Sequence, residues 1–186
     1  MRAAREVFSE LGYDAATFQA IAIRADLTRP AINHYFASKR LLYQEVVDQT
    51  NALVIEAAVQ QSQREGTLAG RIRAFIQAVV QAEGQDRSVA AFLVTAVLES
   101  ERHPELAESN HDSREFTRGY IKAAIKDAIE SGEVRADMDI EAAAEMFMAV
   151  MWGLGFYAGF VDDKERLFAI TEQFLELLSG KAWHTG

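Results

Sequence analysis

Apolar residues recur at three- and four-residue spacing along almost the whole chain. This spacing is typical of helices that bury one face, and no sustained segment alternates apolar and polar residues as a strand would. The sequence therefore predicts an all-α fold. We expect helices at residues 3–11, 17–25, 28–37, 38–63, 68–83, 86–102, 106–131, 140–160 and 164–179.

Residues that begin or end helices set these boundaries. Gly12 ends the first helix, and Thr17, Thr28 and Ser38 have the side chains of N-cap residues for the next three. Asp139 is expected to cap a later helix in the same way. The other expected breaks lie at "REGT" (64–67), Gly84, "HPE" (103–105), "SGEVRADMD" (131–139) and "VDD" (161–163).

The helix at 28–37 has two different faces. With a rotation of about 100° per residue, Ile32, Tyr35 and Phe36 lie on one side and are expected to face inward. The opposite side and its flanks carry small and polar residues, namely Pro30, Ala31, Asn33 and His34. Two short helices joined by a tight turn, the second with an outward polar face, form a helix-turn-helix.

The outward residue types suit the major groove of DNA. Arg29 can present its guanidinium to guanine, Asn33 can pair with adenine or a phosphate, and Pro30 and Ala31 can touch a thymine methyl group. Thr17, Ser38 and Lys39 lie at predicted helix N-termini, where free backbone N–H groups favour the binding of phosphate. A plain three-helix bundle with a solvated polar face would show the same spacing, which alone leaves both interpretations open.

The net charge of −9 is unevenly distributed. Residues 1–50 contain six lysine or arginine residues and six acidic residues, so the rest of the chain carries the whole −9. Residues 24–40 contain four basic residues and one acid, Asp26, a local excess of +3. Because phosphate binding depends on the local field, the acidic total does not exclude DNA as a partner.

Several classes of chemistry are excluded or unsupported. There is no cysteine, which excludes disulfides, zinc–thiolate sites and thiol nucleophiles. No metal-ligand spacing joins His103, His111 and Asp112, and no glycine-rich phosphate loop or nucleophile elbow occurs. No apolar run reaches the length of a membrane span, and "MRAAREVF" has no secretory apolar segment. We expect no metal, cofactor, membrane partner or enzyme activity, and a cytoplasmic protein.

Residues 3–47 resemble the DNA-binding domain of the TetR family of transcriptional regulators. The resemblance is carried by Phe8-x-x-x-Gly12-Tyr13, by Thr17, by "IAIRADLT", and by the pairs Tyr35-Phe36, Ser38-Lys39 and Leu41-Leu42. It implies a DNA-binding domain at 1–47 and a ligand-binding and dimerisation domain at 48–186. The DNA-binding residues are then expected to be Thr17, Thr28, Arg29, Pro30, Ala31, Asn33, His34, Tyr35, Ser38 and Lys39.

Three positions depart from the family pattern. Asp26 replaces the usual glycine of the turn, but aspartate tolerates a left-handed conformation better than most residues, so we expect the turn to survive. Asn33 stands where an aromatic residue often contacts phosphate. Met1 falls inside the first helix, so the start of that helix is expected to be missing from this chain.

The larger domain carries large aromatic and methionine side chains at helical spacing. Taken singly, each such residue is most often ordinary core; together they can line an apolar pocket with a polar handle. The family resemblance implies a pocket for a small apolar molecule in this domain. The candidate lining residues are Phe75, Val79, Phe92, Val97, Phe116, Tyr120, Met148, Met151, Trp152 and Phe156.

The segment "MWGLGFYAGF" (151–160) has three glycines inside a predicted helix, at about 1 kcal/mol each relative to alanine. Such a strip of small residues permits close helix packing, either within one subunit or across a two-fold dimer interface with the last helix. Similar proteins dimerise through their last two long helices, which favours the dimer. The candidate interface residues are Gly155, Gly159, Leu167, Ile170, Phe174, Leu177 and Leu178.

The sequence therefore predicts a homodimeric regulator, expected to be a repressor, that binds a palindromic operator and is released by a small apolar molecule. The alternative is a regulator of the same fold whose large domain only dimerises or binds a protein partner. An enzyme ranks third, since no residues supply a nucleophile and base.

Overall fold

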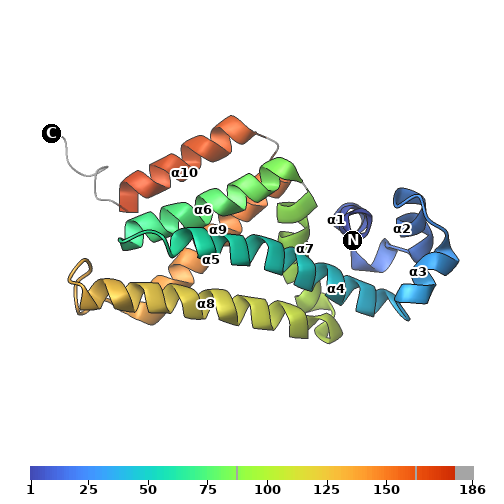
Figure 1. Cartoon of the computed structure of the whole chain (residues 1–186), viewed down its shortest axis with the longest axis horizontal. Helices are drawn as coiled ribbons and strands as arrows, with labels where there is room; N and C mark the ends of the chain where they lie inside the picture. The colour runs from blue at the N-terminus through green and yellow to red at the C-terminus, as the bar shows by residue number, and fades with distance from the viewer. Residues whose placement is uncertain (87, 162, 179–186) are drawn as a thin grey trace.

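The chain folds into a helical molecule with no β-strand among the described residues (Figure 1), which confirms the predicted all-α class. The structure is a computed structural model that describes residues 1–86, 88–161 and 163–178. Its α-helices are α1 (Arg2–Ala15), α2 (Phe18–Arg24), α3 (Arg29–Tyr35), α4 (Lys39–Asn51), α5 (Ala57–Ser62), α6 (Leu68–Gln85), α7 (Ser88–Arg102), α8 (Ala107–Glu130), α9 (Ile140–Phe160) and α10 (Lys164–Leu178). A π-helix (Ala52–Glu56) joins α4 to α5, and a 3₁₀ turn (Pro104–Leu106) precedes α8.

The predicted N-caps are confirmed. The side-chain oxygens of Thr17, Thr28, Ser38 and Asp139 each accept a hydrogen bond from the backbone N–H three residues later, at 3.0–3.3 Å. Each bond satisfies one of the free N–H groups at the start of a helix. Local sequence therefore determined where these helices begin.

The predicted helix end at Gly84 and the predicted continuous helix 38–63 differ from the structure. Gly84 does not end its helix, because α6 continues to Gln85 and stops before Asp86, whose carboxylate accepts a hydrogen bond from the Ser88 N–H at 3.0 Å. A single glycine lowers helix stability by only about 1 kcal/mol, which tertiary packing can offset. The predicted helix 38–63 is interrupted by the π-helix, whereas Gly12 does break the first helix, at φ 75°.

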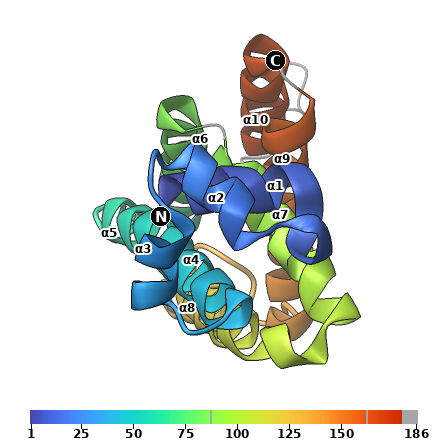
Figure 2. The same ribbon diagram turned by 90° about the vertical axis from the view of Figure 1, so that its right-hand side faces the viewer.

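The helices form an elongated molecule (Figure 1). Helices α1–α3 lie at one end, α4 runs from them into the larger bundle, and α8 and α10 lie on opposite sides of that bundle. Figure 2 views the molecule from the α1–α3 end and shows α1 crossing in front of α7. The chain therefore places a small helical unit at the tip of a larger helical body.

One aromatic core joins the small unit to the larger body. Phe8 and Tyr43 pack edge to face, with ring centroids 4.9 Å apart, and Phe92 of α7 lies 5.5 Å from the Tyr43 ring. The side chain of Phe92 is fully buried here, so its predicted place in a ligand pocket is wrong. The hydrophobic core of residues 1–47 also includes Ala96 and Leu106, which binds the two parts of the chain together.

Polar contacts fix both ends of α1 on α7. At one end, the buried Arg5 guanidinium donates to the Ser88 hydroxyl at 2.9 Å and pairs with the Asp86 carboxylate. Burial acts to raise the pKa of Asp86, but hydrogen bonds from Ser88 and Arg5 outweigh it and hold that pKa below its ordinary value. At the other end, the Tyr13 N–H donates to the buried Glu99 carboxylate at 3.4 Å.

Helix α9 is long and apolar enough, by length and composition alone, to cross a membrane. The expectation that no apolar segment reaches this length is therefore wrong. In the folded chain α9 packs against α6, α7, α8 and α10. Apolar residues of a core helix pass the same test of composition, so the finding by itself does not indicate a membrane protein.

Candidate functional site

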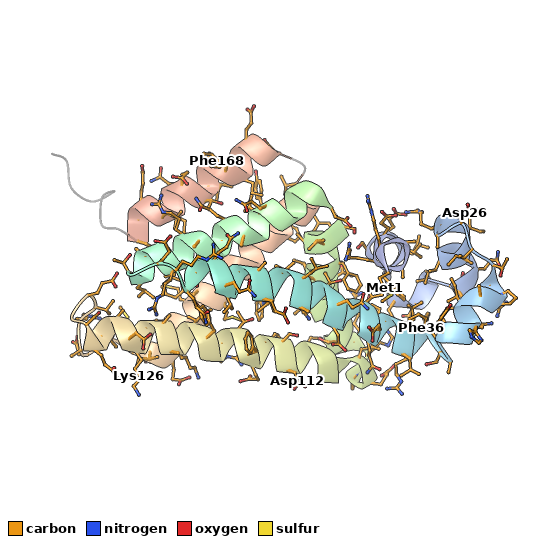
Figure 3. The ribbon with its side chains drawn as sticks, viewed as in Figure 1. Met1, Asp26, Phe36, Asp112, Lys126 and Phe168 are labelled. Atoms are coloured by element: carbon orange, nitrogen blue, oxygen red, sulfur yellow. The ribbon has the colours of Figure 1, made fainter. Side chains whose placement is uncertain are left out.

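The turn between α2 and α3 has the geometry expected of a helix-turn-helix. Asp26 adopts a left-handed conformation with φ 54°, and it is the one non-glycine residue with positive φ among those described. The Leu27 N–H donates to the Ala22 carbonyl at 2.9 Å and closes the turn. Aspartate thus occupies the conformation that glycine usually adopts, as expected. Figure 3 shows Asp26 at the outer end of the small unit.

Helix α3 exposes most of the predicted reading residues. Ile32 is buried and Ala31 is half-buried, whereas the polar and basic candidates are exposed, together with Pro30. The exposed side chains are those of Thr28, Arg29, Pro30, Asn33, His34 and Tyr35. We call these six exposed residues the α3 surface.

Tyr35 was predicted to face inward, and the structure corrects this, since the residue is 78% exposed. The helix ends at Tyr35, and Phe36 is already extended, with φ −128° and ψ 113°. Phe36 packs against the core from this extended position, so the angular projection that grouped it with Tyr35 does not apply. The Tyr35 ring instead packs edge to face with His34, at 5.3 Å between centroids.

The positive charges near α3 are not all free for a ligand. Arg24 forms a two-pronged pair with Glu10, at 2.9 and 2.7 Å, and also contacts Glu6 at 3.3 Å. The hydrogen bond from Arg24 lowers the pKa of Glu10. Arg24 therefore ties α2 to α1, and the local excess of +3 counted from the sequence overstates the charge available to phosphate.

Lys39 has a structural role that the sequence did not reveal. Its ammonium donates to the backbone carbonyls of Tyr13 and Asp14, at 2.7 and 3.0 Å, and lies 4.5 Å from the centre of the Tyr13 ring. These hydrogen bonds satisfy carbonyl groups at the C-terminal end of α1, where the positive charge is also favourable. An ammonium has three N–H donors, so one remains for a phosphate.

The N-cap hydroxyls lie where phosphate contacts are expected. Thr17 and Thr28 are exposed, and Ser38 is half-buried. Each oxygen accepts a backbone hydrogen bond, which leaves the hydroxyl hydrogen free to be donated to an anion. Together with the α3 surface, these groups can position a helix on a nucleic-acid backbone and read base edges.

The larger bundle contains two neighbouring apolar cavities. The larger cavity has a volume of about 120 Å³ and the smaller one about 30 Å³, and both are partly open to solvent. Phe75 and Met151 line both and separate them. Among the predicted pocket residues, the larger cavity also brings together Val97, Met148 and Trp152, and the smaller one contains Tyr120.

Other predicted pocket residues lie elsewhere. Phe116 and Phe156 are exposed, and neither lines these cavities. The side chain of Val79 lies outside the described residues. Periodicity identifies a helical face but not whether that face meets a cavity, the core or solvent, which explains these errors.

Helix α7 has the larger cavity on one side and α1 on the other. Val89, Leu93 and Val97 of α7 line the cavity. On the other side of α7, the Phe92 ring lies near the Phe8 ring of α1, and the Glu99 carboxylate accepts a hydrogen bond from the Tyr13 N–H. The C-terminal residue of α4, Asn51, and the π-helix residues Val54 and Ile55 also line the cavity. Helices α4 and α7, which connect the small unit α1–α3 to the larger body, therefore both contribute residues to the cavity wall.

Comparison with protein families agrees with this arrangement. Residues 1–46 match the family model described as "Bacterial regulatory proteins, tetR family". Residues 68–180 match the model described as "BetI-type transcriptional repressor, C-terminal", which is more than half of the chain. The chain belongs to the TetR family. It is therefore a DNA-binding transcriptional regulator and not an enzyme.

The TetR-family relatives compared below share 21–26% of their residues with this chain. The transcriptional regulator UidR of Escherichia coli K12 is 21% identical over 154 residues, which are 83% of this chain and 76% of UidR. The repressor KstR2 of Rhodococcus jostii is 26% identical over 155 residues, 80% of this chain and 72% of KstR2. The structure of Bacillus subtilis FadR in complex with stearoyl-CoA superposes with a TM-score of 0.80 at 21% identity, covering 95% of this chain and 94% of FadR.

The TetR-family resemblance also implied a dimer interface, and the structure places some of its candidates inside the subunit. A side chain at Gly159 would lie 2.6 Å from the backbone of Ala91, and one at Gly155 would lie 3.4 Å from Val94, so both glycines face α7. Leu167 is 4% exposed and packs with Leu154. We correct the predicted interface accordingly: packing within one subunit accounts for these three residues.

The remaining interface candidates divide between surface and core. Ile170 and Leu177 are exposed, whereas Phe174 and Leu178 are half-buried and pack on neighbouring helices. The outer side of α10 also exposes Phe168 (Figure 3). Large apolar residues of α9 are exposed as well, namely Met146, Trp152, Phe156 and Phe160.

Proposed function

We propose that this TetR-family protein is a ligand-responsive repressor that binds a palindromic operator as a homodimer. In this proposal α3 enters the major groove, where Arg29 and Asn33 contact base edges and Thr17, Ser38 and Lys39 contact phosphates. The exposure of the α3 surface supports these roles. A protein that acts on bacterial DNA is expected in the cytoplasm.

The apolar surface of α9 and α10 supports the dimer. Phe156 and Phe160 are both about half exposed and stack on each other with centroids 5.2 Å apart. Contiguous exposed apolar residues of this size are typical of association surfaces. A two-fold dimer would present two α3 surfaces to half-sites about 34 Å apart on one side of the duplex.

The main support for a ligand response is that α7 contacts the larger cavity on one side and α1 on the other. An apolar molecule in the larger cavity would press on Val89, Leu93 and Val97, and the opposite side of the same helix holds α1 through Phe92 and Glu99. A ligand that binds more tightly to a subunit geometry with the wrong half-site spacing would release DNA. The stearoyl-CoA bound to FadR supports a ligand with a long apolar chain for this fold.

The proposal is tested by selecting DNA that binds the purified chain from a random-sequence pool. We expect enrichment of a palindrome with two half-sites, and loss of binding to it when an apolar inducer is added. A single unpaired site would contradict the dimer. A palindrome whose binding no apolar compound alters would favour the alternative, in which the large domain only dimerises or binds a protein partner.

A further inference from the structure

The larger cavity is apolar on most of its wall but polar along one side. The apolar residues come from the π-helix and from α6, α7 and α9, whereas the polar ones come from the end of α4 and from α8. The polar lining residues are Asn51, Ser113, Arg114 and Thr117. A cavity with this division suits a molecule that has an apolar body and a polar end.

Asn51 has an unused hydrogen-bond donor at this polar side. Its side-chain Nδ2 is buried and has no hydrogen-bond partner in the folded chain. A buried donor without a partner destabilises a protein, so such groups are rare unless a ligand or water completes them. Asn51 is also the last residue of α4, immediately before the π-helix, and π-helical turns occur frequently at functional sites.

Arg114 supplies the charge at the same side. It is the charged residue of the cavity lining, and no carboxylate is among the described residues that line this cavity. Its Nη1 lies 3.9 Å from the Glu101 carboxylate, beyond the range of a normal hydrogen bond. The guanidinium therefore keeps donors for another anion, whereas the buried Thr117 hydroxyl already donates to the Ser113 carbonyl at 3.0 Å.

We propose that Asn51 and Arg114 form an anchor for the carboxylate of an otherwise apolar ligand. A carboxylate accepts hydrogen bonds through both oxygens, and a guanidinium with a carboxamide N–H offers matching donors. The fixed positive charge disfavours an amine, and a neutral alcohol gains no ionic attraction. This inference rests on the proposed function, because it names the chemical class of the inducer that the larger cavity takes.

The test compares decanoate, decanol and decylamine, which share one apolar chain and differ at the head. Calorimetric titration of the full chain without DNA should give decanoate the lowest Kd, roughly 10- to 100-fold below that of decanol, as expected for hydrogen bonds to a charged group. Decylamine should bind most weakly. Equal Kd values for decanoate and decanol, or no binding by any of the three, would overturn the anchor.

Variants assign the effect to the two residues. Arg114→Met should remove the preference for decanoate and leave the Kd of decanol within about threefold, since only the charged contact is lost. Arg118→Met is the matched control, because it removes the same charge from the same helix at a residue that does not line the cavity. A preference that survives Arg114→Met, or that Arg118→Met abolishes as well, would contradict the assignment.

The variant Asn51→Leu tests whether Asn51 binds the ligand or only stabilises the fold. The leucine removes the unpaired donor, so the melting temperature of the ligand-free chain should rise while decanoate affinity falls. A fall in both quantities would mean that Asn51 serves folding alone. Release of operator DNA by decanoate is measured separately: selective binding without release would leave the anchor standing and contradict the ligand-responsive repressor.

Discussion

The contact between α7 and α9 at Gly159 yields the sharpest prediction about packing. An alanine Cβ at this position would lie 2.6 Å from the Cα and N atoms of Ala91 and 3.1 Å from the Ala90 carbonyl carbon. Ordinary contacts between carbon atoms are about 3.5–4.0 Å. Because the opposing atoms belong to a helix backbone and cannot rotate away, the two helices would have to separate by about 1 Å.

Gly153 is the matched control on the same helix. A Cβ there would meet nothing within 4 Å, so Gly153→Ala gains helix propensity without strain and should stabilise the protein by up to about 1 kcal/mol. Gly159→Ala has the same gain but adds overpacking strain at the upper end of the usual range of about 1–3 kcal/mol. We expect it to destabilise by about 1–2 kcal/mol, which places the two variants about 2–3 kcal/mol apart.

Urea unfolding followed by circular dichroism measures this difference. All variants must be compared at one protomer concentration, because the stability of a dimer depends on it. Unchanged m-values would show that the midpoint shifts report stability. Equal midpoints for Gly153→Ala and Gly159→Ala would refute the close approach of α7 and α9, and with it the reason given for a glycine at 159.

Three further predictions concern the DNA-binding unit. Arg29→Ala should weaken binding to the selected operator by about 1–3 kcal/mol and relax one base position, and an unchanged sequence preference in a repeated selection would reject the α3 surface. Lys39→Ala should weaken all DNA sequences alike, flatten the salt dependence and also lower the melting temperature, because its ammonium caps α1; a sequence-selective loss would contradict the phosphate role. The Asp86 carboxylate, whose pKa is lowered in the folded state, stabilises the fold above the ordinary aspartate pKa of about 3.9, and this contribution is lost as pH falls through the lower folded value. Urea unfolding should therefore show a loss of stability in acid that is smaller in Asp86→Asn, and identical slopes would exclude the Arg5–Asp86 pair as its source.

Local chemistry in the sequence was sufficient for the all-α class, for the capped helix starts and for the helix-turn-helix. The caps at Thr17, Thr28 and Ser38 act within three residues of themselves, and the left-handed conformation of the turn lies at the single residue Asp26. These interactions need no knowledge of distant residues. The resemblance to the TetR family rested on the same segment, residues 3–47.

The uses of individual side chains were decided by the tertiary structure. Phe92 and Phe156 both fit an apolar helical face, but the first is buried against Tyr43 and the second is exposed. Lys39 was expected at a phosphate and is also bound to the end of α1. Gly159 was expected at a dimer interface, but it instead allows the backbone of α7 at Ala91 to pack closely against α9.

One physical cause separates what the sequence determined from what the tertiary structure decided. Caps, turns and helical periodicity arise from atoms a few residues apart, so the sequence by itself determined the class of fold, the helix starts and the helix-turn-helix. The cavity, the unpaired Asn51 and the two-sided role of α7 arise where helices distant in the chain meet. Only the packing of those helices sets which atoms come within a few ångströms of each other, and short-range interactions depend on that distance.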